Sequence, residues 1–184
     1  MKTALLLPLL GLSLAPAAHA GVIWSANGHE YEVLLVEGIT WEDARSAAQA
    51  LGAGWDLATI GTAAENTFVE SLLNAGLADR SHFWIGATDV ATEGVWEWVD
   101  GTPFAFTDWS TGEPNNSGNE DFLAYDLRSG NWAWNDAPTN VGSVYGFARG
   151  YVAERQGQSV PEPASLALLG IGLLGLGALR RRRG

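Results

Sequence analysis

The chain has 184 residues, which is room for one globular domain once its two apolar ends are set aside. It carries 21 acidic against ten basic side chains, giving a formal net charge of −11, and it has no cysteine. Such a charge repels nucleic acid and anionic membranes, so we expect no nucleic-acid partner, and it suits a protein that recruits divalent cations. Because cysteine is absent, the fold has no disulfides and must be stabilised by its core or by a metal.

Residues 1–20 have the pattern of a secretory signal peptide. Lys2 precedes an apolar stretch from Ala4 to Leu14, and the small residues of Ala18-His19-Ala20 flank a cleavage point. The apolar stretch is too short to span a bilayer. We therefore expect the mature chain to begin near Gly21, with an exported domain over residues 21–158.

Residues 159–184 form a second sorting segment. Pro161-Glu162-Pro163 is followed by sixteen uncharged residues, 164–179, and then by four arginines, 180–183. As a helix the uncharged run would rise roughly 24 Å, which makes it a marginal anchor in a hydrocarbon core about 30 Å thick. The pattern resembles a PEP-CTERM sorting signal, which implies transient membrane insertion of this short helix and processing by an exosortase. It also implies export to the medium or outer cell surface of a Gram-negative bacterium, with a retained tail anchor as the alternative.

Two helices are expected in the first half of the exported domain. Thr40-Trp41-Glu42-Asp43 and Thr62-Ala63-Ala64-Glu65 each have the pattern of a capping box, which opens a helix. Gly76 is a plausible stop for the second helix. Apolar residues recur at helical spacing and should face the core: Trp41, Ala44, Ala47, Ala48 and Leu51 in the first helix, and Ala64, Phe68, Leu72 and Leu73 in the second.

Short strand-like runs surround and follow these helices. The runs are 31–35, 83–86, 95–99, 122–126, 131–134 and 147–154, separated by Gly, Asp, Asn and Pro. Two early helices and several strands predict an α+β domain. Trp84, Trp96 and Trp98 fall in these runs and are expected in the core rather than on a ligand surface.

The stretch from Thr102 to Asn119 lacks periodicity, and loops this long inside compact domains are usually functional or disordered. Phe106 and Trp109 argue against disorder. Residues 113–121 contain three carboxylates and three amides, and Trp134-Asn135-Asp136 adds one of each. These are hard oxygen ligands of the kind calcium prefers, whereas zinc favours cysteine or histidine. The loop and the 134–136 run therefore predict a calcium site.

Five motifs, in this order, resemble those of the C-type lectin-like domain: Thr40-Trp41-Glu42-Asp43-Ala44, Leu57-Ala58-Thr59-Ile60, Trp84-Ile85-Gly86, Glu113-Pro114-Asn115 and Trp134-Asn135-Asp136. They lie within residues 31–154, which is nearly all of the exported domain. The resemblance implies a C-type lectin-like fold, with two helices packed on short antiparallel sheets and a long calcium-binding loop. It also implies a cis peptide bond before Pro114.

The resemblance further implies where calcium and sugar bind. The sugar-binding calcium would be held by Glu113, Asn115, Glu120, Asn135 and Asp136, leaving coordination positions for two vicinal sugar hydroxyls. An auxiliary calcium site would use Asp89, Glu93, Asn116 and Asp121, although Asp89 and Glu93 can also be read as two solvated loop acids. Glu-Pro-Asn in this family goes with glycans that have equatorial 3- and 4-hydroxyls, of the mannose, glucose and fucose type.

Two other functions are compatible with parts of the sequence. Glu113, Glu120 and Asp136 could supply the acid and base of a glycoside hydrolase, but their Asn neighbours suit a metal cage better, so we expect no catalytic residues and no enzyme. The same scaffold could instead serve a calcium-stabilised matrix or adhesion protein that binds a protein partner. Family members commonly carry disulfides near Phe122 and Ala137, so the loop here should depend more on calcium.

Overall fold

The computed structural model describes residues 21–73, 81–128, 130–139 and 148–157. The expected signal peptide, sorting segment and helix stop at Gly76 lie outside these ranges. Within them, no helix is long and apolar enough to cross a membrane. The whole of the long loop, residues 102–119, lies within the described ranges.

The described residues form two helices and eight strands, which confirms the α+β class. The helices are α1 Trp41–Ala50 and α2 Ala63–Leu73. The strands are β1 Val22–Ile23, β2 Glu30–Leu35, β3 Trp55–Leu57, β4 His82–Thr88, β5 Glu97–Trp98, β6 Phe122–Arg128, β7 Asn131–Ala137 and β8 Ala148–Arg155. The strand expected over 95–99 is thus reduced to two residues.

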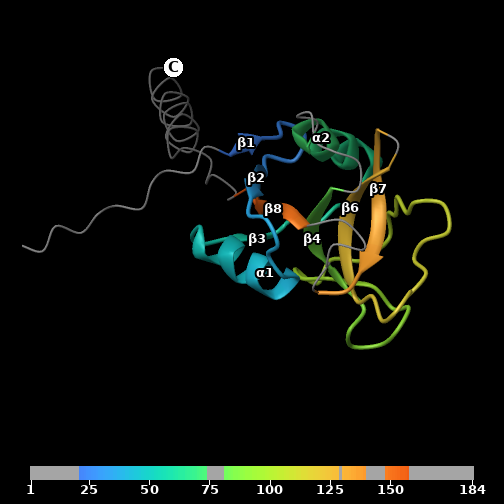
Figure 1. The fold of residues 1–184 in the computed structure, drawn as a ribbon. Helices are drawn as coiled ribbons and strands as arrows, with labels where there is room; N and C mark the ends of the chain where they lie inside the picture. The colour runs from blue at the N-terminus through green and yellow to red at the C-terminus, as the bar shows by residue number, and fades with distance from the viewer. Residues whose placement is uncertain (1–20, 74–80, 129, 140–147, 158–184) are drawn as a thin grey trace, which may run out of the picture.

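The strands are joined in the order β1-β2-β8-β4-β6-β7, with β3 paired to β8 and β5 paired to β4. All of these pairs are antiparallel except β4 with β8, which run parallel. The alternation of apolar and polar residues along each strand does not predict this parallel pairing, because the pairing depends on the position of β8 between β2 and β4. In Figure 1, α1 and α2 lie on opposite sides of the strands, and the long loop lies beyond β6 and β7.

The two faces of the central strands build two cores. On β4, Phe83 and Ile85 pack in the core that contains Val69 of α2, and Trp84 packs in the core that contains Trp41 of α1. Successive side chains of a strand point to opposite faces, so a strand covered on both sides is buried along most of its length. This accounts for the uninterrupted burial of β4 from His82 to Ala87. Trp84 and Trp98 are core residues as predicted, with exposed fractions of 0% and 4%.

The prediction for α1 is confirmed: Thr40 caps it by accepting a hydrogen bond from Asp43 N, and Trp41, Ala44 and Ala48 are buried. The buried face expected for α2 was wrong in part. Ala64 is exposed, whereas Glu65 and Asn66 are buried with Val69 and Leu73. The spacing of apolar residues does not predict this face, because the buried residues in the first turn of α2 are polar and are satisfied by hydrogen bonds.

Those hydrogen bonds join α2 to the sheet. Asn66 Oδ1 accepts from Tyr125 Oη at 2.6 Å and from Trp134 Nε1 at 3.2 Å. Glu65 accepts from Tyr31 Oη and, at 2.8 Å, from Gly61 N. Glu154 on β8 accepts from Thr59 N at 2.8 Å. Buried polar groups are tolerated when partners satisfy them, so the bonds of Glu65 and Asn66 fix α2 on β2, β6 and β7.

Candidate functional site

The long loop between β5 and β6 is fastened to β7 by backbone pairing. Trp134 N donates to Asp108 O at 2.8 Å, and Ser110 N donates to Trp134 O at 2.8 Å. The Asp108 carboxylate accepts from Asn66 Nδ2 at 2.8 Å, which ties the same loop to α2. These bonds place the loop residues after Ser110 next to Asn135 and Asp136.

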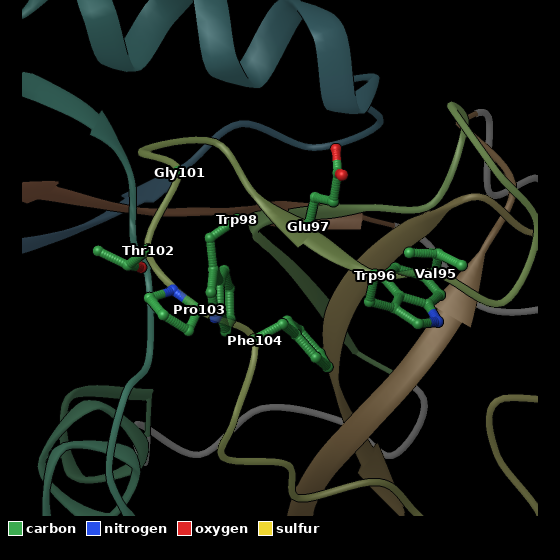
Figure 2. A pocket seen from close by; sticks show the side chains of 8 residues that line it. All are labelled: Val95, Trp96, Glu97, Trp98, Gly101, Thr102, Pro103 and Phe104. Carbon is green, nitrogen blue, oxygen red and sulfur yellow. The ribbon is translucent and has the colours of Figure 1, made fainter.

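Aromatic packing fixes the first part of the loop. Trp109 packs edge-on against Trp134, with ring centroids 5.9 Å apart, and Phe104 packs against Trp98 at 5.1 Å. Trp96 is half-buried and contacts Trp109 at 5.0 Å. Residues 95–98 and 101–104 line a hollow of about 380 Å³. Trp98 and Phe104 lie among these residues, as Figure 2 shows. Burial of these rings orders the loop, as Phe106 and Trp109 led us to expect.

The turn that contains the predicted ligands is held by backbone N–H groups. Asp136 Oδ1 accepts from Asn115 N at 3.2 Å, and Asp136 Oδ2 accepts from Asn116 N at 2.7 Å. Glu120 Oε2 accepts from Ser117 N at 2.8 Å. The Glu113–Pro114 peptide bond is cis, which confirms the prediction from the resemblance. The carboxylates of Asp136 on β7 and of Glu120 just before β6 thus shape the loop that carries the remaining ligands.

The structure brings the five residues expected to bind calcium and sugar together. A cavity of about 170 Å³ is lined by four of them, Glu113, Asn115, Glu120 and Asn135, together with His82, Ser117 and Arg128. The fifth, Asp136, is 1% exposed and lies behind the loop through its two hydrogen bonds. Glu120 and Asn135 are also buried, at 3% and 5% exposed. A small polar cavity is therefore present where the loop meets β6 and β7.

The charge of this cavity favours a cation. The pKa of Glu120 is raised to about 7, chiefly by burial and in addition by the nearby charges of Asp136 and Glu113, against the opposing effects of Ser117 N and Arg128. A buried carboxylate among other carboxylates is costly to ionise unless a cation neutralises it. Calcium is bound by carboxylate and amide oxygens, which is the donor set present here, so these residues fit a calcium ion.

The residues of the expected auxiliary site divide into two groups. Asp89 is 2% exposed, and its Oδ1 has no hydrogen-bond partner in the described part of the chain, while Oδ2 accepts from Gly94 N at 2.8 Å. Burial raises the pKa of Asp89, and the charges of Asp121 and Asp136 add to this effect. Partial desolvation raises the pKa of Glu93, as do the same neighbouring acids. Asp89, Glu93 and Asp121 thus interact electrostatically.

Asn116 instead faces the other site. Its Oδ1 accepts from Glu120 N at 2.8 Å, and its backbone N–H donates to Asp136. Its φ of 46° lies in the left-handed region, which asparagine tolerates better than most residues. Asn116 is thus bonded to Glu120 and Asp136, and its role as a ligand of an auxiliary calcium stays a prediction.

Sequence reasoning missed Arg128 and the two buried groups behind it. Arg128 donates to Glu113 Oε1 at 2.9 Å, to Asn135 Oδ1 at 2.6 Å, and to the Asp126 carboxylate. Asp126 is 0% exposed, and its Oδ1 lies 3.5 Å from His82 Nε2. The signal available in the sequence was the two-residue spacing of Asp126 and Arg128, which puts both side chains on one face of a strand.

A second cluster of ligand-type atoms lies far from the loop in sequence. His29, Glu65 and Glu154 bring such atoms within 4.8 Å of one another. His29 Nδ1 lies 2.5 Å from Glu154 Oε1, and Tyr31 Oη donates to Glu65 and, at 3.3 Å, to Glu154. Since these groups bond to one another, the cluster joins the N-terminal hairpin to α2 and β8.

A two-helix domain with a long loop of oxygen ligands beside a Trp-Asn-Asp strand defines the class of C-type lectin-like domains. The profile of the C-type lectin domain family matches residues 37–145, and the PEP-CTERM protein-sorting profile matches residues 159–183. The chain therefore belongs to the C-type lectin domain family and carries a PEP-CTERM sorting motif, which implies export. Members of this family are generally not enzymes, and they typically bind calcium.

Relatives and solved structures agree with this assignment. The chain is 35% identical over 145 residues to a C-type lectin of Micrurus corallinus, covering 77% of this chain and 90% of that protein. It is 38% identical over 108 residues to C-type lectin domain family 4 member M of Nomascus concolor, of which it covers 25%. The cow carbohydrate-recognition domain of CD23, solved in the presence of a GlcNAc2Man3 oligosaccharide, superposes with a TM-score of 0.61 at 26% identity, covering 79% of this chain and 98% of that one. These similarities support a lectin function.

Proposed function

We propose that the protein is a calcium-dependent lectin for glycans of the mannose, glucose and fucose type, displayed on or released from the outer surface of a Gram-negative bacterium. The observation that carries the proposal is the cavity of about 170 Å³ between the loop and β7, which is lined by Glu113, Asn115, Glu120 and Asn135. The Micrurus lectin and the oligosaccharide in the CD23 structure support a sugar as the ligand class.

Glu113, Asn115, Glu120, Asn135 and Asp136 would hold the calcium ion, which when bound supplies coordination positions for two vicinal hydroxyls. The carboxylates of Glu113 and Glu120 accept the hydroxyl protons, and the amide nitrogens of Asn115 and Asn135 donate to the hydroxyl oxygens. The order of carboxylate and amide around the cavity thus selects hydroxyl pairs of one geometry, which we propose to be equatorial 3- and 4-hydroxyls. Asp136 keeps the loop in place through Asn115 N and Asn116 N.

The auxiliary site would hold a second calcium ion through Asp89, Glu93, Asn116 and Asp121. The buried Asp89 Oδ1 without a hydrogen-bond partner among the described residues supports this role. Because Asp121 directly precedes β6 and Asn116 contacts Glu120, an ion there would stiffen the wall of the sugar cavity. Exosortase processing of the C-terminal segment remains part of the proposal.

A glycan array tests the function. The full chain is applied in calcium and again in EDTA, beside the double variant Asn135→Ala/Asp136→Ala. We expect calcium-dependent signal on mannose-, glucose- or fucose-terminated glycans, and its loss in EDTA and in the double variant. An array without signal on any sugar would contradict the proposal, and signal that persists in EDTA would contradict the calcium dependence.

A further inference from the structure

The guanidinium of Arg128 donates hydrogen bonds to three side chains. Its Nη1 donates to Glu113 Oε1 at 2.9 Å and its Nη2 donates to Asn135 Oδ1 at 2.6 Å, while Nε donates to the Asp126 carboxylate. A guanidinium presents its N–H donors in a rigid planar fork, so three simultaneous partners fix its position. The cation therefore lies at the wall of the cavity and contacts groups from the loop, β6 and β7.

The anchor of this guanidinium lies in the protein interior. Asp126 is 0% exposed, and its second oxygen, Oδ1, lies 3.5 Å from Nε2 of His82, which is 1% exposed. The side chain of Glu113 is 5% exposed, whereas that of Arg128 is 32% exposed. Buried acidic partners strengthen the ion pairs of Arg128 relative to pairs on the surface. Arg128 is thus a fixed charge and not a mobile surface cation.

Two of the three partners of Arg128 are expected calcium ligands, so this inference rests on the function proposed above. Glu113 Oε1 and Asn135 Oδ1 belong to the expected ligand set, and the carboxylates of that set are Glu113, Glu120 and Asp136. A calcium ion bound to the same oxygens would lie close to a guanidinium of like charge, and like charges at short range repel. The two cations cannot both make their best contacts with Glu113 and Asn135.

We propose that Arg128 competes with calcium for Glu113 and Asn135. The guanidinium keeps these two side chains in place when calcium is not bound, and calcium must displace it or share its oxygens in order to bind. Arg128 therefore lowers the affinity of the site for calcium and stabilises the protein without calcium. The opposing interpretation is that Arg128 only positions Glu113 and Asn135 as ligands, and it predicts weaker calcium binding when Arg128 is replaced.

The test is a calorimetric calcium titration of the full chain, together with melting curves in EDTA. Arg128→Gln alone would leave Asp126 buried without its cation, so the main variant is Arg128→Gln/Asp126→Asn, which removes both charges. We expect it to bind calcium roughly tenfold more tightly, the scale of one charge-assisted hydrogen bond, and to melt at a lower temperature in EDTA. Arg128→Lys keeps the charge but not the fork, and we expect a smaller gain in affinity.

Arg149→Gln is the matched control, because Arg149 pairs with the exposed Glu37 at 3.0 Å, away from the cavity, and its loss should leave calcium affinity unchanged. Equal or weaker calcium binding by the folded Arg128→Lys protein or by the folded double variant would overturn the competition. Absence of calcium binding by the wild-type chain would overturn both this inference and the proposed function, so the two failures are distinguishable.

Discussion

Asp136 is the residue through which β7 holds the ligand-bearing loop, so replacing it tests the construction of the site. Its two carboxylate oxygens accept from Asn115 N at 3.2 Å and from Asn116 N at 2.7 Å. The side chain is 1% exposed. In Asp136→Ala both backbone N–H groups lose their partner, and the proposed calcium site loses one carboxylate.

The cost of Asp136→Ala follows from these contacts. Two hydrogen bonds to a charged group contribute about 1.5–3 kcal/mol each, which gives a gross loss of about 3–6 kcal/mol. Part of this is recovered, because Asn115 and Asn116 are exposed and water can solvate their N–H groups. Repulsion between Asp136 and Glu120 is also relieved. We therefore expect a net loss of about 2 kcal/mol, which lowers Tm by about 6–10 °C for a domain of this size.

Thermal unfolding followed by tryptophan fluorescence, in EDTA and in saturating calcium, measures both effects of Asp136→Ala. We expect the lower Tm in EDTA and a smaller increase of Tm on adding calcium than in the wild type. Glu97→Ala is the charge-matched control, because Glu97 is exposed, and it should behave like the wild type. A Tm in EDTA within about 2 °C of the wild type would refute the anchoring role, and a full calcium-induced increase would refute the role as a ligand.

Three further predictions concern calcium, Glu120 and Glu154. Calcium should raise the Tm of the wild-type chain and EDTA should lower it, because an ion that binds only the folded state stabilises it; identical melting curves would count against occupied sites. Calcium affinity should fall as the pH drops below about 7, because the raised pKa of Glu120 makes calcium compete with a proton; a calorimetric affinity that is constant from pH 7.5 to 5.5, roughly this window, would contradict this. Glu154→Gln should flatten the dependence of the free energy of unfolding on pH. Burial raises the pKa of Glu154 in the folded protein, so its contribution to stability is complete below the pKa of the unfolded chain and is lost as the pH rises through the folded-state pKa. Denaturant titrations at several pH values measure this, and the same dependence on pH in both proteins would disprove it.

The sequence predicted the elements that depend on local patterns. The capping residues and the apolar spacing of α1 gave its start and its buried face, and the strand runs at 83–86 and 122–126 lie within β4 and β6. The parallel pairing of β4 with β8 and the burial of Glu65 and Asn66 in the first turn of α2 were not predicted. Both depend on distant partners, since Asn66 is buried only because Tyr125 and Trp134 donate to it.

The site shows the same division. Glu113, Asn115 and Glu120 were expected from the composition of the loop and from the family resemblance, and the loop does bring them to Asn135 beside one cavity. Arg128 was missed, although it lies in the same cavity. Neither the spacing of apolar residues nor the clustering of oxygen ligands in the sequence indicates a role for a single arginine at the end of a strand. Its role appears only in the folded protein, where β6 pairs with β7 and the Arg128 side chain reaches Asn135 Oδ1 on β7 and Glu113 Oε1 in the loop.

A calorimetric calcium titration of the full chain, with and without methyl mannoside, tests directly whether calcium and sugar share one site. If one ion is held by Glu113, Asn115, Glu120, Asn135 and Asp136 and also bound by sugar hydroxyls, calcium and sugar must strengthen each other's binding by the same factor. We expect tighter calcium binding with methyl mannoside and a smaller effect with methyl galactoside. A calcium affinity that does not change with either sugar would contradict it.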